Sequence, residues 1–555
     1  MKHHLTFLRI YDIFSPYKNY NTLKTMSNKK KSIARNLFLI TLSLFLFSCA
    51  HLGFKSSNSV ADKIITPELM KQHIFTLASD SMKGRNTPSP EIDSAANYIA
   101  GVFKSSGLQT VNGSYFQKVG LGIISLAQDN HLKISKDGGE ISFKIKTEFT
   151  PFDMTGNQEV NGQVVFVGYG ITAPDYKYDD YKDIDANGKI VFILKHEPQE
   201  NDSNSVFKGI DETEHSNVSQ KVKNAIAHGA VGVLIATDPL NHTSLTPRGF
   251  PWPSLSKTLP KDALPTVLID DEIKKVPVVQ VGEEVIANLF GDVDKLKEIQ
   301  SQIDSTMQPH SFVIENATVS LKTSITVEDK SSQNVIGYLE GSDPKLKDEI
   351  LIIGGHYDHV GYMKQHADTV DYIFNGADDN ASGTSAVIAV AQAFSAMNQK
   401  PKRSVLFIAF TGEEKGLMGS RSYVNKPLFP LDQTVAMLNI DMVGRNGIDS
   451  LYMVSEAACP DLAQINEEEN KEIGFTLVDE EKLQGGSDHM SFQKKKIPFL
   501  FYHSGLHSDL HKVSDEPETI NLEKAAKAAQ LVFRTAWRIA NDDKKYKLVD
   551  SKTLF

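Results

Sequence analysis

The chain has 555 residues, of which 40% are hydrophobic and 23% are charged, the composition of an ordinary globular protein. This length suggests more than one domain. The formal net charge of -10 gives no sign of a polyanion-binding surface, so we expect no nucleic acid among the partners.

Residues 1–49 predict a leader with a lipoprotein signal peptide. A basic stretch from Met26, MSNKKKSIAR, precedes the apolar run LFLITLSLFLF at 37–47. This run is shorter than the roughly 20 residues that span a bilayer, and a basic head with a short apolar middle is typical of a signal peptide. The ending LFSC resembles the bacterial lipobox, which implies that Cys49 is lipidated and anchors an exported protein to the outer or cell membrane. The alternative is a plain secretory signal that contains a cysteine.

Cys459 is the second of the two cysteines. With Cys49 lipidated, Cys459 has no partner within the chain, so we expect no disulfide framework. Stability must then come from the core or from metals. We interpret Cys459 as a small buried apolar residue.

Residues 61–130 contain two helical patterns. The first, ITPELMKQHIFTLASD, opens with Thr66 as a cap and with Pro67 at the first helical position. The second, SPEIDSAANYIAGVFKSSG, has apolar residues at helical spacing and ends at Gly107. We assign this segment to the N-terminal helical part of the domain that residues 326–545 form.

Residues 131–325 have the texture of a β-rich domain. Short runs such as HLKISKDGGEISFKIK, QVVFVGYGI, GKIVFILKH and PTVLID are separated by Gly, Pro, Asn and Asp, which predicts strands. A helix followed by a strand is predicted for SQKVKNAIAHGAVGVLIATDP. VVFVGYGI, NGKIVFILK and AHGAVGVLIA resemble the protease-associated (PA) domain, an insert that is expected to cover an active site or to help bind substrate. The alternative is an uncharacterised β-rich insert, and we identify no catalytic cluster in this segment.

Residues 326–545 alternate buried-strand runs with helical patterns. The runs are NVIGYLEG, DEILIIGG, SVLFIAFT, TVAMLNI, LYMVS and IPFLFYH, and the helical patterns include ASGTSAVIAVAQAFSAM and NLEKAAKAAQLVFRTAWRIAN. This alternation predicts an α/β domain with a largely parallel mixed sheet flanked by helices. In such sheets the active site lies beyond the carboxyl ends of the strands.

Histidines and carboxylates follow these runs one after another. They are His356, Asp358, Asp378, Asp379, Glu413, Glu414, Asp441 and His511. Imidazole and carboxylate suit zinc and similar ions. Three carboxylates and two histidines exceed one tetrahedral site, but two metals about 3.5–4 Å apart can share them if one carboxylate bridges. Two divalent ions, three carboxylates and one hydroxide also sum to zero charge, which suits a partly buried site.

HYDHVG, NGADDNASG, TGEEKGLMGS, NIDMVG and LHKVSDE together resemble the M28 family of co-catalytic zinc peptidases, mostly aminopeptidases. The resemblance covers 333–541 and makes the PA-like segment an insertion into a zinc-peptidase fold. It implies two Zn²⁺ ions per chain and peptide substrates. It also implies that His356 and Asp441 bind one metal, that Glu414 and His511 bind the other, and that Asp379 bridges them.

The resemblance implies that Glu413 is the general base that takes a proton from the metal-activated water. Asp358 is expected to accept the other ring N–H of His356. The stretch GGSDHMSF, with Asp488 and His489, resembles a part of the family that lines the substrate site. The alternative is that Ser487 or Asp488 only caps a helix.

Several residues near these motifs have simpler interpretations. His359, His366, His503 and His507 are interpreted as solvated loop histidines, although HYDH offers two imidazoles and we prefer His356 as the ligand. Asp378 is expected to support Asp379 and to cap the following helix. Many relatives carry a Tyr that helps to stabilise the oxyanion where this chain has Leu510. Either another donor serves here, with Tyr502 as the candidate, or the metals stabilise the oxyanion alone.

The sequence therefore favours an exported zinc aminopeptidase. A carboxypeptidase or dipeptidase of the same fold is the second interpretation. Glutaminyl cyclase, a single-zinc relative, fits less well because all five ligand positions suit two metals. A binding module on an inactive peptidase fold is disfavoured by the intact Glu413.

Overall fold

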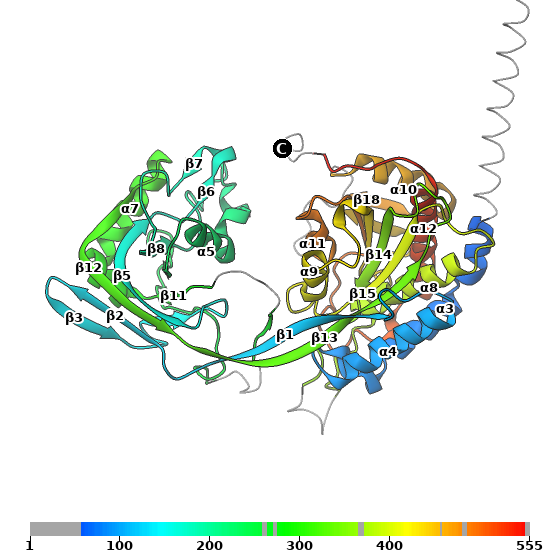
Figure 1. Ribbon diagram of the computed structural model, residues 1–555, viewed down its shortest axis with the longest axis horizontal. Helices are drawn as coiled ribbons and strands as arrows, with labels where there is room; N and C mark the ends of the chain where they lie inside the picture. The colour runs from blue at the N-terminus through cyan, green and yellow to red at the C-terminus, as the bar shows by residue number, and fades with distance from the viewer. Residues whose placement is uncertain are drawn as a thin grey trace, which may run out of the picture. The chain divides into compact units, whose positions relative to one another are not determined.

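The computed structural model describes residues 57–257, 264–269, 275–363, 371–454, 458–479 and 486–549. The chain forms two compact units, one from the residues up to Gln117 together with those from Asn334 onward, and one from Lys118–Gln333 (Figure 1). The predicted signal peptide and Cys49 lie outside the described residues. Within the described part of the chain, no helix has the length and apolar character needed to cross a membrane.

The first unit begins with the two predicted helices, α3 (Pro67–Leu77) and α4 (Pro90–Ser105). Each has proline in its first turn, and each is capped by a hydroxyl. Thr66 accepts a hydrogen bond from the backbone N–H of Leu69 at 3.2 Å, and Ser89 accepts one from Ile92 at 3.1 Å. These caps fix where the helices start, as predicted for Thr66 and Pro67.

A nine-stranded mixed sheet runs through the centre of this unit, and its strand β10 and most of its strand β1 belong to residues of the second unit. The prediction of a largely parallel sheet is confirmed. Its order is β10-β1-β13-β15-β14-β16-β19-β17-β18. β14 pairs in parallel with β15 and β16, and β16 pairs in parallel with β19, whereas β13 and β17 are antiparallel to their inner neighbours. The strands are β1 (Phe116–Leu126), β10 (Thr266–Leu268), β13 (Ile325–Leu339), β14 (Ile350–His356), β15 (Ser404–Phe410), β16 (Thr434–Ile440), β17 (Ser450–Val454), β18 (Thr476–Asp479) and β19 (Phe499–His503).

Helices flank both faces of this sheet (Figure 1). They are α8 (Gly383–Ser395), α9 (Met418–Asn425), α10 (Pro460–Ile473), α11 (His489–Gln493) and α12 (Leu522–Asn541). Leu351 and Ile353 of β14 pack with α3, α8 and α12, while Ile350 and Ile352 pack with α9 and α11 on the other face. Because both faces are covered, the central strands are continuous apolar runs. Cys459 is a buried free thiol in this unit, as expected.

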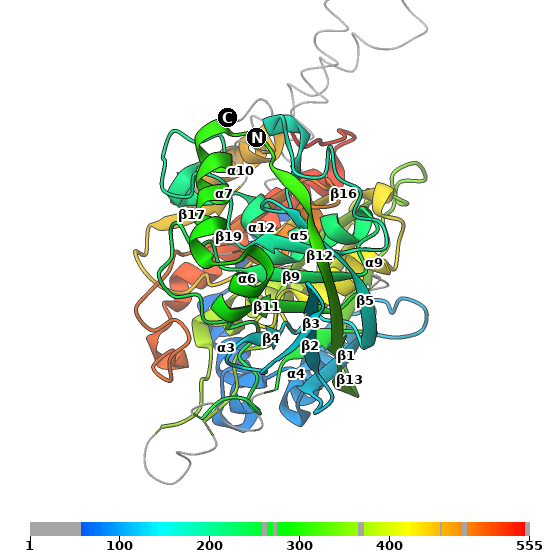
Figure 2. The same ribbon diagram turned by 90° about the vertical axis from the view of Figure 1, so that its left-hand side faces the viewer.

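The second unit is built on an eight-stranded mixed sheet, which confirms the predicted β-rich domain. Its order is β3-β2-β12-β5-β8-β9-β11-β4, and β5, β8, β9 and β11 are parallel. Figure 2 shows α6, α7 and β12 on the side that faces the viewer. The elements are β2 (His131–Lys136), β3 (Gly139–Phe143), β4 (Phe149–Pro151), β5 (Gln158–Val167), β8 (Ile190–Leu194), β9 (Gly232–Ala236), β11 (Val278–Val281), β12 (Ser311–Thr323), α5 (Val218–Ala227), α6 (Glu283–Phe290) and α7 (Val293–Thr306), with the short pair β6 (Thr172–Ala173) and β7 (Tyr178–Asp179).

The unit boundaries differ from the expected segments 61–130, 131–325 and 326–545. The second unit starts at Lys118 and ends at Gln333. The shift arises because β1 and β13 are long strands that each run through a boundary. The polar stretch TVEDKSSQ within β13 has the composition of a linker, so its strand structure is not evident from the sequence.

Candidate metal centre

The strands deliver their polar side chains to one edge of the first unit's sheet. His356 is the last residue of β14, and Asp441 directly follows the parallel neighbour β16. Glycine is required directly before His356 for a steric reason. A Cβ on Gly355 would lie 2.4 Å from the carbonyl oxygen of Ile440. The two strands therefore approach closely where both side chains leave the sheet.

The first group of candidate ligands is His356, Asp379 and Asp441, all buried. The Nε2 atom of His356 lies 3.2 Å from Oδ1 of Asp441 and 3.3 Å from Oδ1 of Asp379. Although burial opposes it, the charges of Asp441 and Glu413 hold the pKa of His356 well above its usual value. This first cluster joins the three predicted ligand residues of one metal.

The second group surrounds the other oxygen of Asp379. The Nε2 atom of His511 lies 3.1 Å from Oδ2 of Asp379 and 3.0 Å from Oε2 of Glu414. Hydrogen bonds to these two carboxylates raise the pKa of His511 to about 10. Asp379 thus turns Oδ1 to the first cluster and Oδ2 to this second cluster, which is the position of a bridging carboxylate.

The donor atoms fit two zinc ions. A tetrahedral ion with bonds of about 2.0–2.1 Å keeps its ligand atoms roughly 3.3 Å apart, close to the nitrogen–oxygen distances of both clusters. Despite burial, hydrogen bonds from His356 and His511 hold the pKa of Asp379 well below its usual value. The buried carboxylates therefore need positive charge beside them, which divalent cations would supply.

His359 is buried and contacts the second cluster, so its interpretation as a solvated histidine is wrong. Its Nδ1 atom lies 2.7 Å from Oε1 of Glu414 and 3.7 Å from Oδ2 of Asp379. Its backbone N–H donates to the carbonyl of Arg85 at 3.2 Å, which turns the chain inward after Asp358. HYDH thus places one imidazole beside each cluster, with His356 in the first cluster as predicted.

The solvated interpretation is also wrong for two further histidines. His503 is buried on β19, where its ring stacks on Phe501 with centroids 4.9 Å apart, and burial lowers its pKa to about 4. The side chain of His507 is only 3% exposed, and its Nε2 atom lies 3.4 Å from Oδ2 of Asp378. His366 lies outside the described residues.

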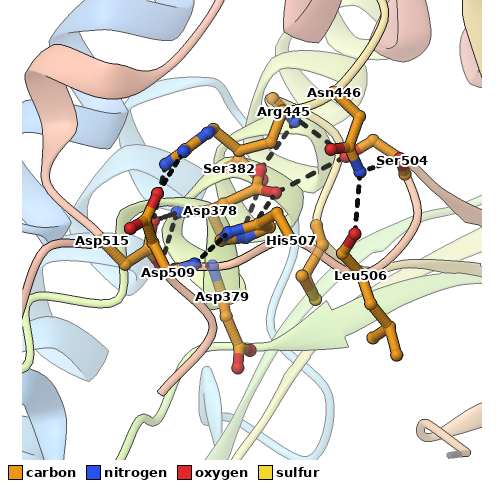
Figure 3. A network of polar contacts seen from close by, with 12 residues as sticks. Asp378, Asp379, Ser382, Arg445, Asn446, Ser504, Leu506, His507, Asp509 and Asp515 are labelled. Atoms are coloured by element: carbon orange, nitrogen blue, oxygen red, sulfur yellow. Dashed lines mark hydrogen bonds and ion pairs between the residues drawn. The ribbon is translucent and has the colours of Figure 1, made fainter. Parts of the chain in front are cut away.

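Figure 3 shows that Asp378 lies in a polar network while the carboxylate of Asp379 points away from it. Oδ1 of Asp378 accepts from the backbone N–H of Gly444 at 2.7 Å and from the Ser382 hydroxyl at 2.9 Å. Asp378 therefore ties the loop before α8 to the loop after β16, as its supporting role requires. The predicted helix cap is wrong, because neither this turn nor α8 has a side-chain cap bond.

Asp515, four residues after His511, holds the backbone of Asp378 and Asp379 in place. Its carboxylate accepts the backbone N–H groups of Asp378 at 3.0 Å and of Asp379 at 3.1 Å. Burial raises the pKa of Asp515 to about 6. Asp515 belongs to the motif LHKVSDE, four residues after His511, but the sequence alone assigns it no role.

Glu413 belongs to neither cluster, which leaves its carboxylate free for proton transfer. Burial, with the charges of Asp441 and Asp488, raises its pKa well above the usual value against the opposing charge of His356. The backbone N–H of Glu413 donates to Oδ1 of Asp358 at 3.1 Å. Asp358 therefore positions the backbone of Glu413 directly.

Asp358 also contacts the ring of His356, and its backbone carbonyl lies nearer to that ring than its carboxylate does. The Nδ1 atom of His356 lies 3.2 Å from the backbone carbonyl oxygen of Asp358 and 3.7 Å from its carboxylate. The carbonyl is the nearer acceptor because the carboxylate is turned toward the backbone of Glu413.

The expected substrate residues lie deeper than predicted. Asp488 is fully buried, and burial raises its pKa to about 7. It precedes α11 without a side-chain cap bond, so the capping alternative is wrong for it. His489 stacks on Phe501 with centroids 4.4 Å apart, and burial lowers its pKa to about 3, so it is a neutral packing residue.

Tyr502 cannot serve as the oxyanion donor, and that prediction is wrong. Its ring is buried on β19, and its hydroxyl donates to Oδ1 of Asn466 on α10 at 2.9 Å. The period of two along a strand turns Tyr502 toward the helical layer. The substitution at Leu510 therefore leaves the oxyanion contact to other groups.

Arg85 is a supporting residue that sequence reasoning missed. Its buried guanidinium donates to the carbonyls of Leu77 at 2.5 Å, Asn375 at 2.7 Å and both Tyr357 and Gly376 at 2.9 Å. It thereby fixes the loops that carry His356, His359 and Asp379. The only sequence signal is a Gly-Arg pair between two helices.

The chain is similar to several known proteins. Residues 334–536, which carry both clusters, match the family model of peptidase family M28, and residues 160–289 match that of the PA domain. Aminopeptidase YwaD of Bacillus subtilis strain 168 is 26% identical over 407 residues, which cover 71% of this chain and 72% of that protein. A probable zinc metalloprotease of Pyrenophora teres f. teres is 34% identical over 114 residues, which cover 20% of this chain and 23% of that protein. Among solved structures, the aminopeptidase from Aneurinibacillus sp. strain AM-1 is 22% identical with a TM-score of 0.48, covering 88% of this chain and 97% of that chain.

Proposed function

We propose that the chain is a two-zinc aminopeptidase of peptidase family M28. Residues 334–536 match the model of that family, and residues 160–289, which precede them, match the model of the PA domain. The observation that carries the proposal is the orientation of Asp379, whose two oxygens face different clusters. His356 and Asp441 would hold one ion. Glu414 and His511, with His359 beside them, would hold the other.

Bound zinc would lower the pKa of a nearby water and polarise the scissile carbonyl. Glu413 takes the proton of that water and passes it to the leaving amine. Asp358 holds the backbone of Glu413, and Asp515 holds the backbone of Asp379. These hydrogen bonds fix the position of the proposed base relative to the proposed bridging ligand.

We expect cleavage to require a free α-amine. The metal-loaded wild-type protein is incubated with a tripeptide, with its N-acetylated form and with its C-terminally amidated form. These three peptides separate an aminopeptidase from a carboxypeptidase. The free and amidated peptides should lose their first residue, and the acetylated peptide should stay intact, as followed by mass spectrometry.

Removal of the last residue from the acetylated peptide would instead support the carboxypeptidase alternative. A peptide and aminoacyl-p-nitroanilide panel that stays wholly intact would support a binding module on this fold. Both outcomes contradict the aminopeptidase proposal.

We also propose that the protein is exported and anchored to the cell envelope through lipidated Cys49. Support comes from the basic head, the short apolar run and the lipobox-like ending of residues 26–49. In a bacterial host, the wild-type chain should appear in the membrane fraction, and Cys49→Ser should not be lipidated. A wild-type chain that is processed and soluble would contradict the anchor and support a plain secretory signal.

A further inference from the structure

A third cluster of metal-binding side chains lies in the second unit, well apart in sequence from the peptidase residues. It consists of His196, Glu200, Asp238 and His242. His196 and Asp238 each stand two residues after a strand, β8 and β9, which are parallel neighbours with Leu194 opposite Ala236. Glu200 and His242 follow four residues later in the same two loops. Adjacent strand ends thus bring two donor pairs together.

The side chains turn their donor atoms toward one point. Oδ1 of Asp238 accepts from the backbone N–H of His196 at 3.1 Å, which fixes the carboxylate and directs Oδ2 to the cluster. That oxygen contacts Nδ1 of His196 and lies 3.6 Å from Nε2 of His242. Oε1 of Glu200 lies 3.0 Å from Nε2 of His242, and Oε2 of Glu200 lies 3.9 Å from Nδ1 of His196.

Charge balance favours a cation at this point over a pair of ring protons. The two imidazole rings stack with centroids 4.4 Å apart, so protonating both would place two cations in contact. One proton leaves an excess of negative charge around Asp238, which is fully buried. The neighbouring ammonium of Lys221 donates to the backbone carbonyls of Tyr169 and His196, each at 2.5 Å. Its charge is shared among the carboxylates of Asp238, Asp180 and Glu197, so it offsets only part of the charge of Asp238.

The pKa of the neighbouring Asp304 is also affected by the negative charge of the cluster. Burial raises the pKa of Asp304 to about 6, and the charges of Asp238 and Glu200 contribute to the rise. Two neutral imidazoles and two carboxylates bring a charge of -2, which one divalent cation neutralises. The nitrogen pair favours zinc over calcium or magnesium, which prefer oxygen ligands.

We propose that His196, Glu200, Asp238 and His242 bind one zinc ion that ties the loop after β8 to the loop after β9. Four protein ligands complete a tetrahedral sphere, so the ion has a structural role. It lies beside a cavity of about 660 Å³ that His196, His242, Thr237 and Arg248 line. The ion would therefore stiffen one wall of this cavity.

The zinc content of full-length wild type, His242→Gln and the control His228→Gln tests the site. His228 is an exposed histidine of the same unit that stacks on Tyr181 and contacts no member of the cluster. After dialysis against buffered nanomolar free zinc, wild type and His228→Gln should each contain about one ion more than His242→Gln. Aminopeptidase activity should stay at the wild-type level in all three.

Equal zinc contents in wild type and His242→Gln would overturn the proposal and leave an ion-pair cluster. Because the readout is a difference between variants, it does not depend on the peptidase ions or on the proposed function. If His242→Gln does not purify as folded protein, Glu200→Gln is measured in its place, with the same expected loss. Thermal unfolding adds a second readout, since zinc should raise the unfolding temperature of the wild type more than that of the variant.

Discussion

Glu413→Gln is expected to lower kcat/KM for an aminoacyl-p-nitroanilide by about 10²- to 10⁴-fold, the range of general-base catalysis, without loss of bound zinc. Glutamine keeps the shape of the side chain but cannot accept the proton. Zinc should stay bound because Glu413 belongs to neither cluster. The measurements are steady-state kinetics and zinc content, both relative to wild type.

The adjacent Glu414 provides the matched control. Glu414→Gln makes the same substitution at the residue next to Glu413. The carboxylate of Glu414, unlike that of Glu413, belongs to the second cluster. Glu414→Gln should therefore lose about one zinc ion along with activity, whereas Glu413→Gln loses activity alone. Wild-type activity in Glu413→Gln, or equal zinc loss in the two variants, would contradict the division of roles between these neighbours.

Asp379→Asn is expected to release about two zinc ions relative to wild type and to abolish measurable peptidase activity. Asparagine presents one oxygen and no charge, so it cannot offer an anionic ligand to both clusters. Without that charge, the remaining carboxylates in each cluster balance a divalent ion less well. Metal analysis after dialysis at fixed free zinc measures the loss.

Asp441→Asn serves as the comparison, because Asp441 belongs only to the first cluster. It should release about one ion, half of the loss from Asp379→Asn. Circular dichroism establishes that both variants remain folded. An identical loss of one ion from both variants would disprove the bridging position of Asp379.

Much of the fold and the ligand set could be predicted from the order of residues along the chain. The central strands are buried on both faces, so runs such as SVLFIAFT are unmistakable, and the residues after them must share one sheet edge. By contrast, β1 and β12 were not predicted, because Gly120 and Gly122 interrupt the apolar run of β1, and Glu315 and Asn316 interrupt that of β12.

The errors concern side chains whose surroundings come from distant segments. His359 looks like a loop residue, and only the turn held by Arg85 buries it beside Glu414. Tyr502 lies next to the site in sequence, yet the strand period turns it toward α10. Local spacing identifies which residues are available at the edge, but tertiary contacts decide which way each one faces.

The position of Arg85 bears on how the active site forms during synthesis. This side chain precedes the inserted unit, whereas the carbonyl of Tyr357 that it binds lies 272 residues later. During synthesis, the N-terminal helices therefore cannot pack against the peptidase strands until the insert and then those strands have been translated. A recombinant fragment that begins at residue 334 would lack both the helices and this arginine. The inserted unit thus separates in time two segments that the folded peptidase needs together.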